Sequence, residues 1–294
     1  MKQSYHEASA RKRLLGVLDP DSFVELLPPQ ARVTSPHLPA LDLPVAFDDG
    51  VVVGAGALNG RRVLAASEEG EFMGGAVGEV HGAKLTGLLE RAVAQKPDAV
   101  LLLLESGGVR LHEANAGLIA VSEIMRALLA ARAAGVVVIA LIGGTYGCFG
   151  GMGIVAKCCD VVIMSEEGRL GMSGPEVIET AHGVEEFDAR DRALVWRTVG
   201  GKHRYLLGDA DDLVEDDIAA FRAAAIRALD AARPPTLDNL LAEHAFLAQR
   251  LHLFGTCRDA LDIWRALGLK TAESVALLDT AGFLEAAEKI RLRG

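Results

Sequence analysis

The stretch AVLLLLESGGV at residues 99–109 is an apolar run with strand character that ends in a glycine-rich turn. The same pattern returns at residues 136–153, where VVVIALI runs into GGTYGCFGGMG, and in both places a helical pattern follows. Short apolar runs that alternate with helical segments are typical of strands in a parallel sheet. The sequence therefore predicts an α/β protein whose mostly parallel sheet has helices outside it.

The two glycine turns are the first candidate for a functional site. Glycine permits positive φ and, because it has no Cβ, lets a ligand approach the backbone. The first amides of a helix have no intrahelical acceptor, and the helix dipole adds positive potential there. Two such turns side by side would direct N–H groups at an oxygen that becomes negative, as in an oxyanion hole. We expect the donors to be Gly107 and Gly108 in the first turn and Gly150 and Gly151 in the second.

Composition narrows the class of protein. The 294 residues are 50% apolar with a formal net charge of −10, which favours a globular protein and argues against nucleic acid as a partner. No apolar run approaches the roughly 20 residues that span a bilayer, and the N-terminus lacks the apolar core of a secretory leader. The four cysteines have neither zinc-site spacing nor the density of a disulfide scaffold. We expect buried thiols, no metal, no membrane contact and a cytoplasmic location.

Three regions are expected along the chain. Residues 1–44 comprise an amphipathic helix within 5–27, with Arg11, Lys12 and Arg13 on its solvated face, and a proline-rich connector. Residues 45–233 form the main domain. Residues 234–294 follow a Pro-Pro pair and have the pattern of two or three helices, at 237–253, 257–267 and 271–292.

Inside the main domain, Asn59-Gly60 is a strong signal for a hairpin between strands Val51–Ala57 and Arg62–Ser67. A helix is expected from Gly82 to Gln95, with its leucines on one face. Another is expected to begin at Pro175, since proline suits the first helical position. The acidic stretch 209–217 is expected to be a solvated loop.

Six blocks in a fixed order resemble a known family. They are ASARKRLLGVLDPDSFVEL (8–26), EFMGGAVGEVHGAK (71–84), ESGGVRLHEANAGL (105–118), GCFGGM (147–152), RLGMSGPEVIE (169–179) and HGVEEFDARDR (182–192). With them the chain resembles the acyl-CoA carboxyltransferase family, and within it the β subunits of bacterial malonate decarboxylases. The four-cysteine zinc ribbon of the acetyl-CoA carboxylase β subunit is absent, because no cysteine precedes Cys148. His112 departs from the family, which carries glutamine there, and no family motif is found after Pro235.

The resemblance implies a crotonase-like fold of repeated ββα units, followed here by a C-terminal helical segment. It implies a β subunit that, with a γ subunit, decarboxylates malonyl-thioester to acetyl-thioester and CO2, with the active site where the two subunits meet. The thioester is carried on the coenzyme A-derived prosthetic group of an acyl carrier subunit, loaded by an acyl-transferase subunit of the same complex. This chain is expected to hold no covalent cofactor, no biotin and no metal.

Weaker signals concern the residues that would bind the prosthetic group. Gly74 and Gly75 form a glycine loop before a helix. Lys84 is a candidate to meet the phosphates of the pantetheine arm, but a solvated lysine is the preferred interpretation. Arg110 follows the first glycine turn and is expected either to contact phosphate or carboxylate or to form an ion pair with Glu113.

The proton donor to the enolate is left open. His81, His112 and His182 are conceivable acids, but water can supply that proton. Ser106 lies in ESGG rather than in a GxSxG elbow, so a nucleophilic serine is not expected.

Two other functions remain compatible with the motifs. One is a carboxyltransferase β subunit that passes carboxyl groups to or from biotin, in a biotin-dependent acyl-CoA carboxylase or decarboxylase. The other is a structural partner whose glycine loops bind the acyl carrier without chemistry.

Overall fold

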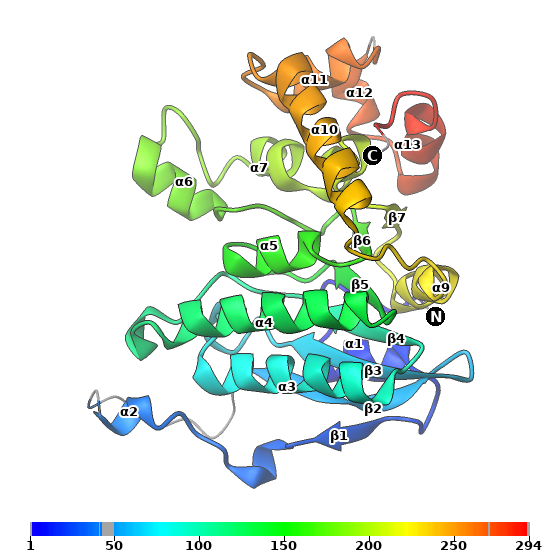
Figure 1. The fold of residues 1–294 in the computed structure, drawn as a ribbon. Helices are drawn as coiled ribbons and strands as arrows, with labels where there is room; N and C mark the ends of the chain where they lie inside the picture. The colour runs from blue at the N-terminus through cyan, green and yellow to red at the C-terminus, as the bar shows by residue number, and fades with distance from the viewer. Residues whose placement is uncertain (1, 41, 43–49, 270, 293–294) are drawn as a thin grey trace.

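The computed structural model describes residues 2–40, 42, 50–269 and 271–292, and a mixed sheet runs through its centre (Figure 1). In these residues seven strands pair in chain order. The pairs β1–β2 and β2–β3 are antiparallel, and all pairs from β3 to β7 are parallel. The strands are β1 Val24–Leu26, β2 Val51–Leu58, β3 Arg61–Glu68, β4 Ala99–Leu103, β5 Val137–Ile142, β6 Val161–Ser165 and β7 Asp212–Val214.

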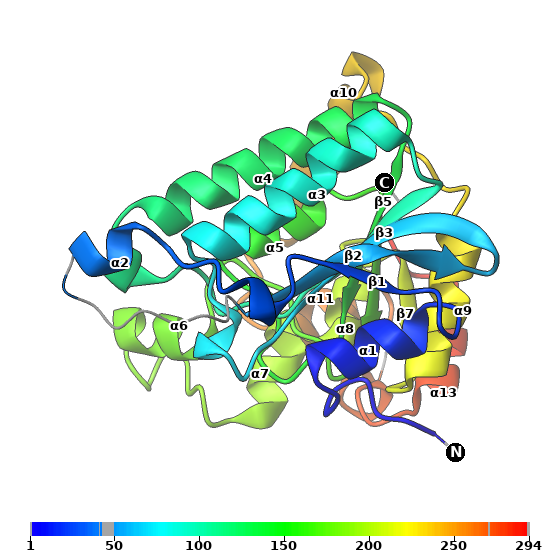
Figure 2. The same ribbon diagram turned by 90° about the horizontal axis from the view of Figure 1, so that it is seen from below.

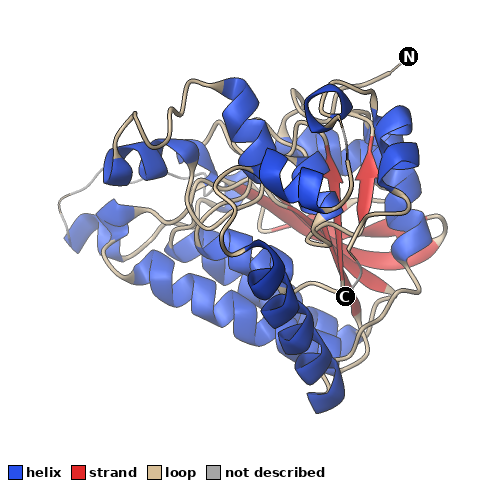
Figure 3. Cartoon of the chain, turned by 90° about the horizontal axis from the view of Figure 1, so that it is seen from above, coloured by secondary structure: helices blue, strands red, loops and turns tan. Residues whose placement is uncertain are grey.

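Helices surround this sheet (Figure 3). The α-helices are α1 Ala10–Val17, α2 His37–Ala40, α3 Glu79–Gln95, α4 Ala116–Ala133, α5 Gly151–Lys157, α6 Pro175–His182, α7 Arg192–Val199, α8 Gly201–Leu206, α9 Ile218–Ala228, α10 Leu237–Phe254, α11 Ala260–Ala266, α12 Ala272–Val275 and α13 Thr280–Ala287. Short 3-10 turns occupy η1 Pro29–Ala31, η2 Met73–Gly75 and η3 Leu111–Glu113.

Helices α3, α4 and α5 cover one face of the sheet, and α1 and α9 cover the other (Figure 2). Strands β3 to β6 step across the sheet in one direction, so right-handed crossovers place all three connecting helices on the same side. Alternate residues of β4 serve the two layers: Val100 and Leu102 pack toward α3 and α4, and Leu101 and Leu103 toward α1 and α9. Both faces of the sheet are therefore buried, as the continuous apolar runs predicted.

A second, short strand-like segment follows each parallel strand. Single β-bridges join Val77 to Val109, Ser106 to Cys148, and Cys148 to Leu170. Each unit is therefore a strand, a short bridging segment and a helix. The expected crotonase-like fold of repeated ββα units is confirmed, and the bridging segments contain the glycine turns.

Three local predictions in the main domain are confirmed. Asn59 and Gly60 both take positive φ, 52° and 75°, as a type I′ hairpin turn requires. Helix α3 buries the leucines that were expected on one face, Leu85, Leu88 and Leu89. Pro175 is the first residue of α6, as expected.

The N-terminal prediction needs correction. Helix α1 ends at Val17, and Val24–Leu26 is an edge strand that pairs with β2. Arg13 is only 3% exposed, although its neighbour Arg11 lies at the surface and binds Glu25. One turn of helix therefore carries a buried cation beside an exposed one, because α1 packs against the sheet instead of lying free.

The C-terminal helices begin close to their expected starts and form a small core of their own. Trp264 and Phe283 pack against Leu206 of α8 and Leu213 of β7. The acidic stretch before them is not simply a solvated loop, since it contains β7 and the buried residue Asp209. No helix in the described ranges is long and apolar enough to cross a membrane.

We expect His203 to make stability depend on pH. Its Nδ1 accepts a hydrogen bond from Trp264 Nε1 at 3.1 Å, and burial lowers the pKa of His203 to about 3 from 6.5. The unfolded chain therefore binds a proton that the folded chain excludes between pH 6.5 and about 3. Stability should fall as pH drops through that window, by up to about 4 kcal/mol.

Urea unfolding followed by tryptophan fluorescence at pH 7.5, 6, 5 and 4 measures this slope. His203→Gln should flatten it relative to wild type, whereas His252→Gln, on the exposed side of α10, should leave it unchanged. Equal slopes in wild type and His203→Gln would contradict the assignment.

Candidate active site

The two glycine turns lie side by side, as predicted. Ser106 N–H donates to Gly147 O and Phe149 N–H donates to Ser106 O, each at 2.8 Å. A Cβ added to Gly150 would lie 3.2 Å from the Cα of Gly108. The backbones touch at this point, which explains why both turns use glycine.

Only two of the four predicted amide donors are open. Gly107 N–H donates to Gly74 O at 2.8 Å, and Gly150 N–H donates to Met172 O at 3.0 Å. These two amides are engaged by protein carbonyls in this structure, so their prediction as oxyanion donors is corrected.

The other two amides have no backbone carbonyl as acceptor among the described residues. Gly108 N–H faces only Ser106 Oγ, at 3.3 Å, which is long for such a bond. Gly151 is the first residue of α5, where an N–H has no intrahelical acceptor. A Cβ added to Gly108 would meet nothing within 4 Å, so space lies open before this turn. Gly108 and Gly151 are therefore the candidate oxyanion donors, one from each turn.

The residues predicted to bind the prosthetic group have structural partners instead. Lys84 is buried, and its Nζ donates to Val51 O at 2.6 Å. Arg110 is also buried: its Nε donates to Ala76 O at 2.9 Å and its Nη1 to Glu113 at 3.1 Å. The ion pair left open as an alternative for Arg110 is the arrangement found. Neither cation is placed for phosphate, which corrects both predictions.

Gly74 and Gly75 contact the backbone at the first turn. The carbonyl of Gly74 accepts the N–H of Gly107, and a Cβ on Gly75 would lie 1.9 Å from Glu105 O. Both residues have positive φ, 66° and 67°. Close backbone packing therefore requires glycine at position 75, and the positive φ favours glycine at position 74.

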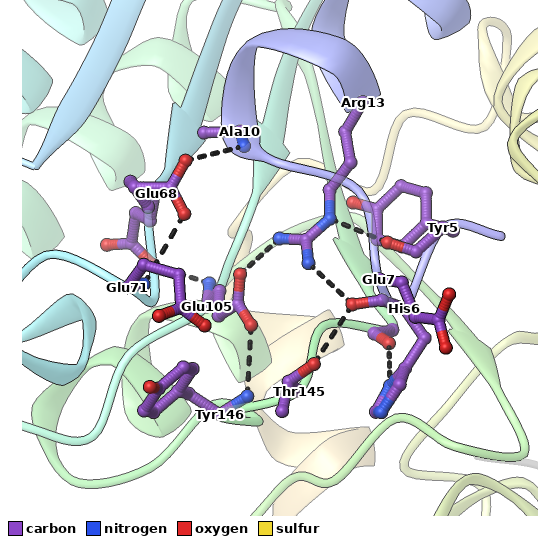
Figure 4. A network of polar contacts seen from close by, with 12 residues as sticks. Tyr5, His6, Glu7, Ala10, Arg13, Glu68, Glu71, Glu105, Thr145 and Tyr146 are labelled. Atoms are coloured by element: carbon purple, nitrogen blue, oxygen red, sulfur yellow. Dashed lines mark hydrogen bonds and ion pairs between the residues drawn. The ribbon is translucent and has the colours of Figure 1, made fainter.

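A buried carboxylate that the sequence did not reveal joins the two turns (Figure 4). Glu105, the residue before the first turn, accepts the N–H of Tyr146 in the second turn at 2.9 Å. Its other oxygen forms an ion pair with Arg13 of α1, and both side chains are 3% exposed. Glu68, which contacts His81 at 3.1 Å, accepts the N–H of Glu105 at 2.8 Å. His81 is therefore part of this network beneath the turns.

Arg13 is held in place by more than its carboxylate partner. Its Nε donates to Tyr5 O at 2.7 Å, and its Nη2 donates to His6 O at 3.0 Å. Burial raises the pKa of Tyr5, whose ring stacks on Phe221 of α9 with 3.9 Å between ring centres. The N-terminal segment thus reaches the base of the site and neutralises Glu105.

The remaining candidate side chains belong to the second turn, η3 and α6. Burial raises the pKa of Cys148 well above its usual value, as an inert thiol requires, and the cysteines are unpaired. His182 ends α6, and His112 lies in η3. Among the described residues, no group of three or more His, Cys, Asp or Glu side chains could hold a metal ion.

Comparison with known proteins places this fold and site in one family. The carboxyl transferase domain model matches residues 5–239. The chain is 40% identical over 311 aligned positions to malonyl-S-ACP:biotin-protein carboxyltransferase MADC of Malonomonas rubra, with 98% of this chain and 97% of that protein covered. The chain belongs to the carboxyl transferase family.

Solved structures identify the branch within that family. A chain of the Pseudomonas malonate decarboxylase hetero-tetramer in complex with malonate has a TM-score of 0.81 and 39% identity, covering 90% of this chain and 97% of that one. A chain of the Pseudomonas MdcD-MdcE hetero-dimer has a TM-score of 0.68 and 36% identity, covering 85% and 97%. This chain is therefore a member of the malonate decarboxylase branch of the carboxyl transferases.

Replacing Glu105 by glutamine should destabilise the protein by about 3–5 kcal/mol, because Arg13 would keep a buried charge without its counterion. Urea denaturation of the purified chain measures this. Glu123→Gln is the matched control, since Glu123 pairs with Arg126 at the surface and should cost less than about 1 kcal/mol.

The double variant Glu105→Gln, Arg13→Met should recover part of the loss, because it removes the unpaired charge. A loss for Glu105→Gln no larger than that for Glu123→Gln would contradict the role of this pair.

Proposed function

We propose that this chain is the β subunit of a malonate decarboxylase. With a γ subunit, it decarboxylates malonyl-thioester on an acyl carrier protein, giving acetyl-thioester and CO2 in a carboxy-lyase reaction. The observation that carries the proposal is the pair of open amides, Gly108 and Gly151, on adjoining turns of a carboxyl transferase fold. Similarity along nearly the whole chain to malonate decarboxylase proteins supports it.

The proposed decarboxylation requires both amides to lie close to the same thioester oxygen. When the C–C bond to the carboxylate breaks, its electron pair moves onto the thioester carbonyl and CO2 leaves, so the oxygen becomes an enolate oxygen. Donors preset toward that oxygen favour the transition state over the ground state. One such donor contributes about 3 kcal/mol by analogy with other oxyanion holes. The enolate carbon then takes a proton, which water can supply.

The partner surface is supported by apolar side chains in η3 and α4, which follow the first turn, and by Met172, whose carbonyl accepts the N–H of Gly150 in the second turn. Leu111 in η3 is 85% exposed, Ile119 in α4 is 62% exposed and Met172 before α6 is 64% exposed. Isolated monomers rarely expose several large apolar groups near one site. A γ subunit over this surface would close the space before the amides.

The proposal places the remaining components on other chains. The acyl carrier subunit supplies the coenzyme A-derived prosthetic group, and an acyl-transferase subunit loads it. This chain itself is assigned no covalent cofactor, no biotin and no metal.

Removing one donor should lower the rate without removing the fold. Proline at Gly151 replaces the amide hydrogen by a ring carbon and so removes the donor, and proline is tolerated as the first residue of a helix. Because a Cβ there would lie 2.6 Å from a methyl carbon of Val121, the test is made in a Val121→Ala background. Gly151→Pro should lower kcat for CO2 release about 100- to 1,000-fold relative to Gly151→Ala in the same background.

Gly151→Ala keeps the amide and is therefore the matched control. A substitution of Gly108 would be less informative, because its φ of +132° strains other residues. Normal assembly with partner chains and equal turnover of the two variants would instead support a purely structural subunit.

A second candidate function is transfer of the carboxyl group to a biotin protein. It is favoured by the M. rubra relative, whose name is malonyl-S-ACP:biotin-protein carboxyltransferase. The same enolate forms in this reaction, so the same amides would serve, and only the fate of the carboxyl group differs.

Carbon dioxide release by the co-purified β and γ chains from malonyl-thioester distinguishes the two functions. We expect CO2 release without biotin, and avidin should not affect it. In the proposed reaction the carboxyl group leaves as CO2 and is not passed to biotin. Activity only when a biotin protein is added, with the carboxyl group recovered on biotin, would establish the second function instead.

A further inference from the structure

Helix α10 lies on the outside of the molecule with its outer face uncovered (Figure 1). None of its 18 residues is buried. Its inner side is anchored by Arg250, whose Nη1 lies 2.8 Å from Oδ1 of Asp209, and by Phe246, whose ring lies under that guanidinium. These contacts fix the direction of the helix and leave the opposite side to solvent.

That outer side carries a stripe of leucines, which we call the leucine stripe. Its members and their exposed fractions are Leu237 71%, Leu240 57%, Leu241 58%, Leu247 45% and Leu251 73%. The spacing of three, four and seven residues places them along one side of a helix. It is also the a/d pattern of a coiled-coil seam, with His244 at a central a position. An exposed apolar stripe of this length is typical of a protein-binding surface.

The leucine stripe is symmetric about His244. Leu237 and Leu251 lie seven residues on either side of it, and Leu241 and Leu247 lie three residues on either side. Two such helices that run antiparallel, with His244 opposite His244, would therefore place leucine against leucine at both ends and beside the centre. A surface that complements itself in this way is the requirement of a two-fold interface.

Charge favours the same arrangement. Asp238 and Glu243, the two acidic residues of α10, both lie in its N-terminal half. Antiparallel pairing keeps the acidic half of one helix away from that of the other and sets the two helix dipoles in opposite directions. A parallel pairing would place the acidic halves together.

We propose that the leucine stripe binds the leucine stripe of a second copy of this chain, antiparallel and centred on His244. The interface joins two copies through their C-terminal segments. It lies on a different element from the glycine turns, so the proposal is independent of the function assigned to that site.

Sedimentation velocity of the full chain, alone and co-purified with partner subunits, tests the surface. Wild type should form a two-copy species at micromolar concentration, and Leu240→Asp with Leu247→Asp should raise its dissociation constant at least 100-fold. Leu277→Asp is the matched control, because Leu277 is 87% exposed outside α10 and should leave association unchanged. Unaltered circular dichroism will establish that the variants are folded.

Disulfide trapping tests the geometry in a Cys257→Ser background. His244→Cys should cross-link two copies, whereas Leu251→Cys should not, because residue 251 meets residue 237 of the other chain. Mixing Leu237→Cys and Leu251→Cys chains should give the cross-linked pair.

Three results would overturn the proposal. One is a monomeric wild type, and another is a dimer that the leucine substitutions leave intact. The third is loss of a different subunit, with self-association unchanged, when the stripe is altered.

Discussion

One buried carboxylate, that of Glu105, holds the candidate site together. It stands at the end of β4, directly before the first glycine turn, and it accepts an amide of the second turn at Tyr146. A charge in this position is costly unless it is paired. Arg13 provides that pair from α1, 92 residues earlier in the chain. The relative placement of the two glycine turns therefore depends on this ion pair in the core as well as on the backbone hydrogen bonds between the turns.

Some parts of the fold could be predicted from the sequence, and others depend on tertiary contacts. The parallel strands, the hairpin at Asn59-Gly60 and helix α3 follow from apolar periodicity and local turn chemistry, which are properties of neighbouring residues. The burial of Arg13 does not follow from such local properties. The helix that carries it also exposes Arg11, and only the tertiary contact of α1 with the sheet decides which cation is enclosed. The edge strand β1 was missed for a similar reason, because three residues are too few to show a period.

The candidate site, too, could be predicted only in part. Sequence located both glycine turns and placed them together, since the carboxyl ends of adjacent parallel strands share one edge of the sheet. It could not distinguish the amides within each turn. Gly107 and Gly150 satisfy carbonyls contributed by Gly74 and Met172, from outside their own turns, and such pairings appear only when the chain is folded. Lys84 and Arg110 have the right chemistry for phosphate, but burial determined their partners.

The length of the outermost strands has a consequence for the chain as a whole. Strands β1 and β7 each have three residues, whereas those between them have five to eight. Pro28 and Pro29 follow β1 by two and three residues, and neither has a backbone N–H to donate to a neighbouring strand. Short edge strands and prolines at the edge are two ways in which natural β-sheets avoid edge-to-edge aggregation. Exposed apolar side chains on the helices can thus coexist with sheet edges that resist pairing with other chains.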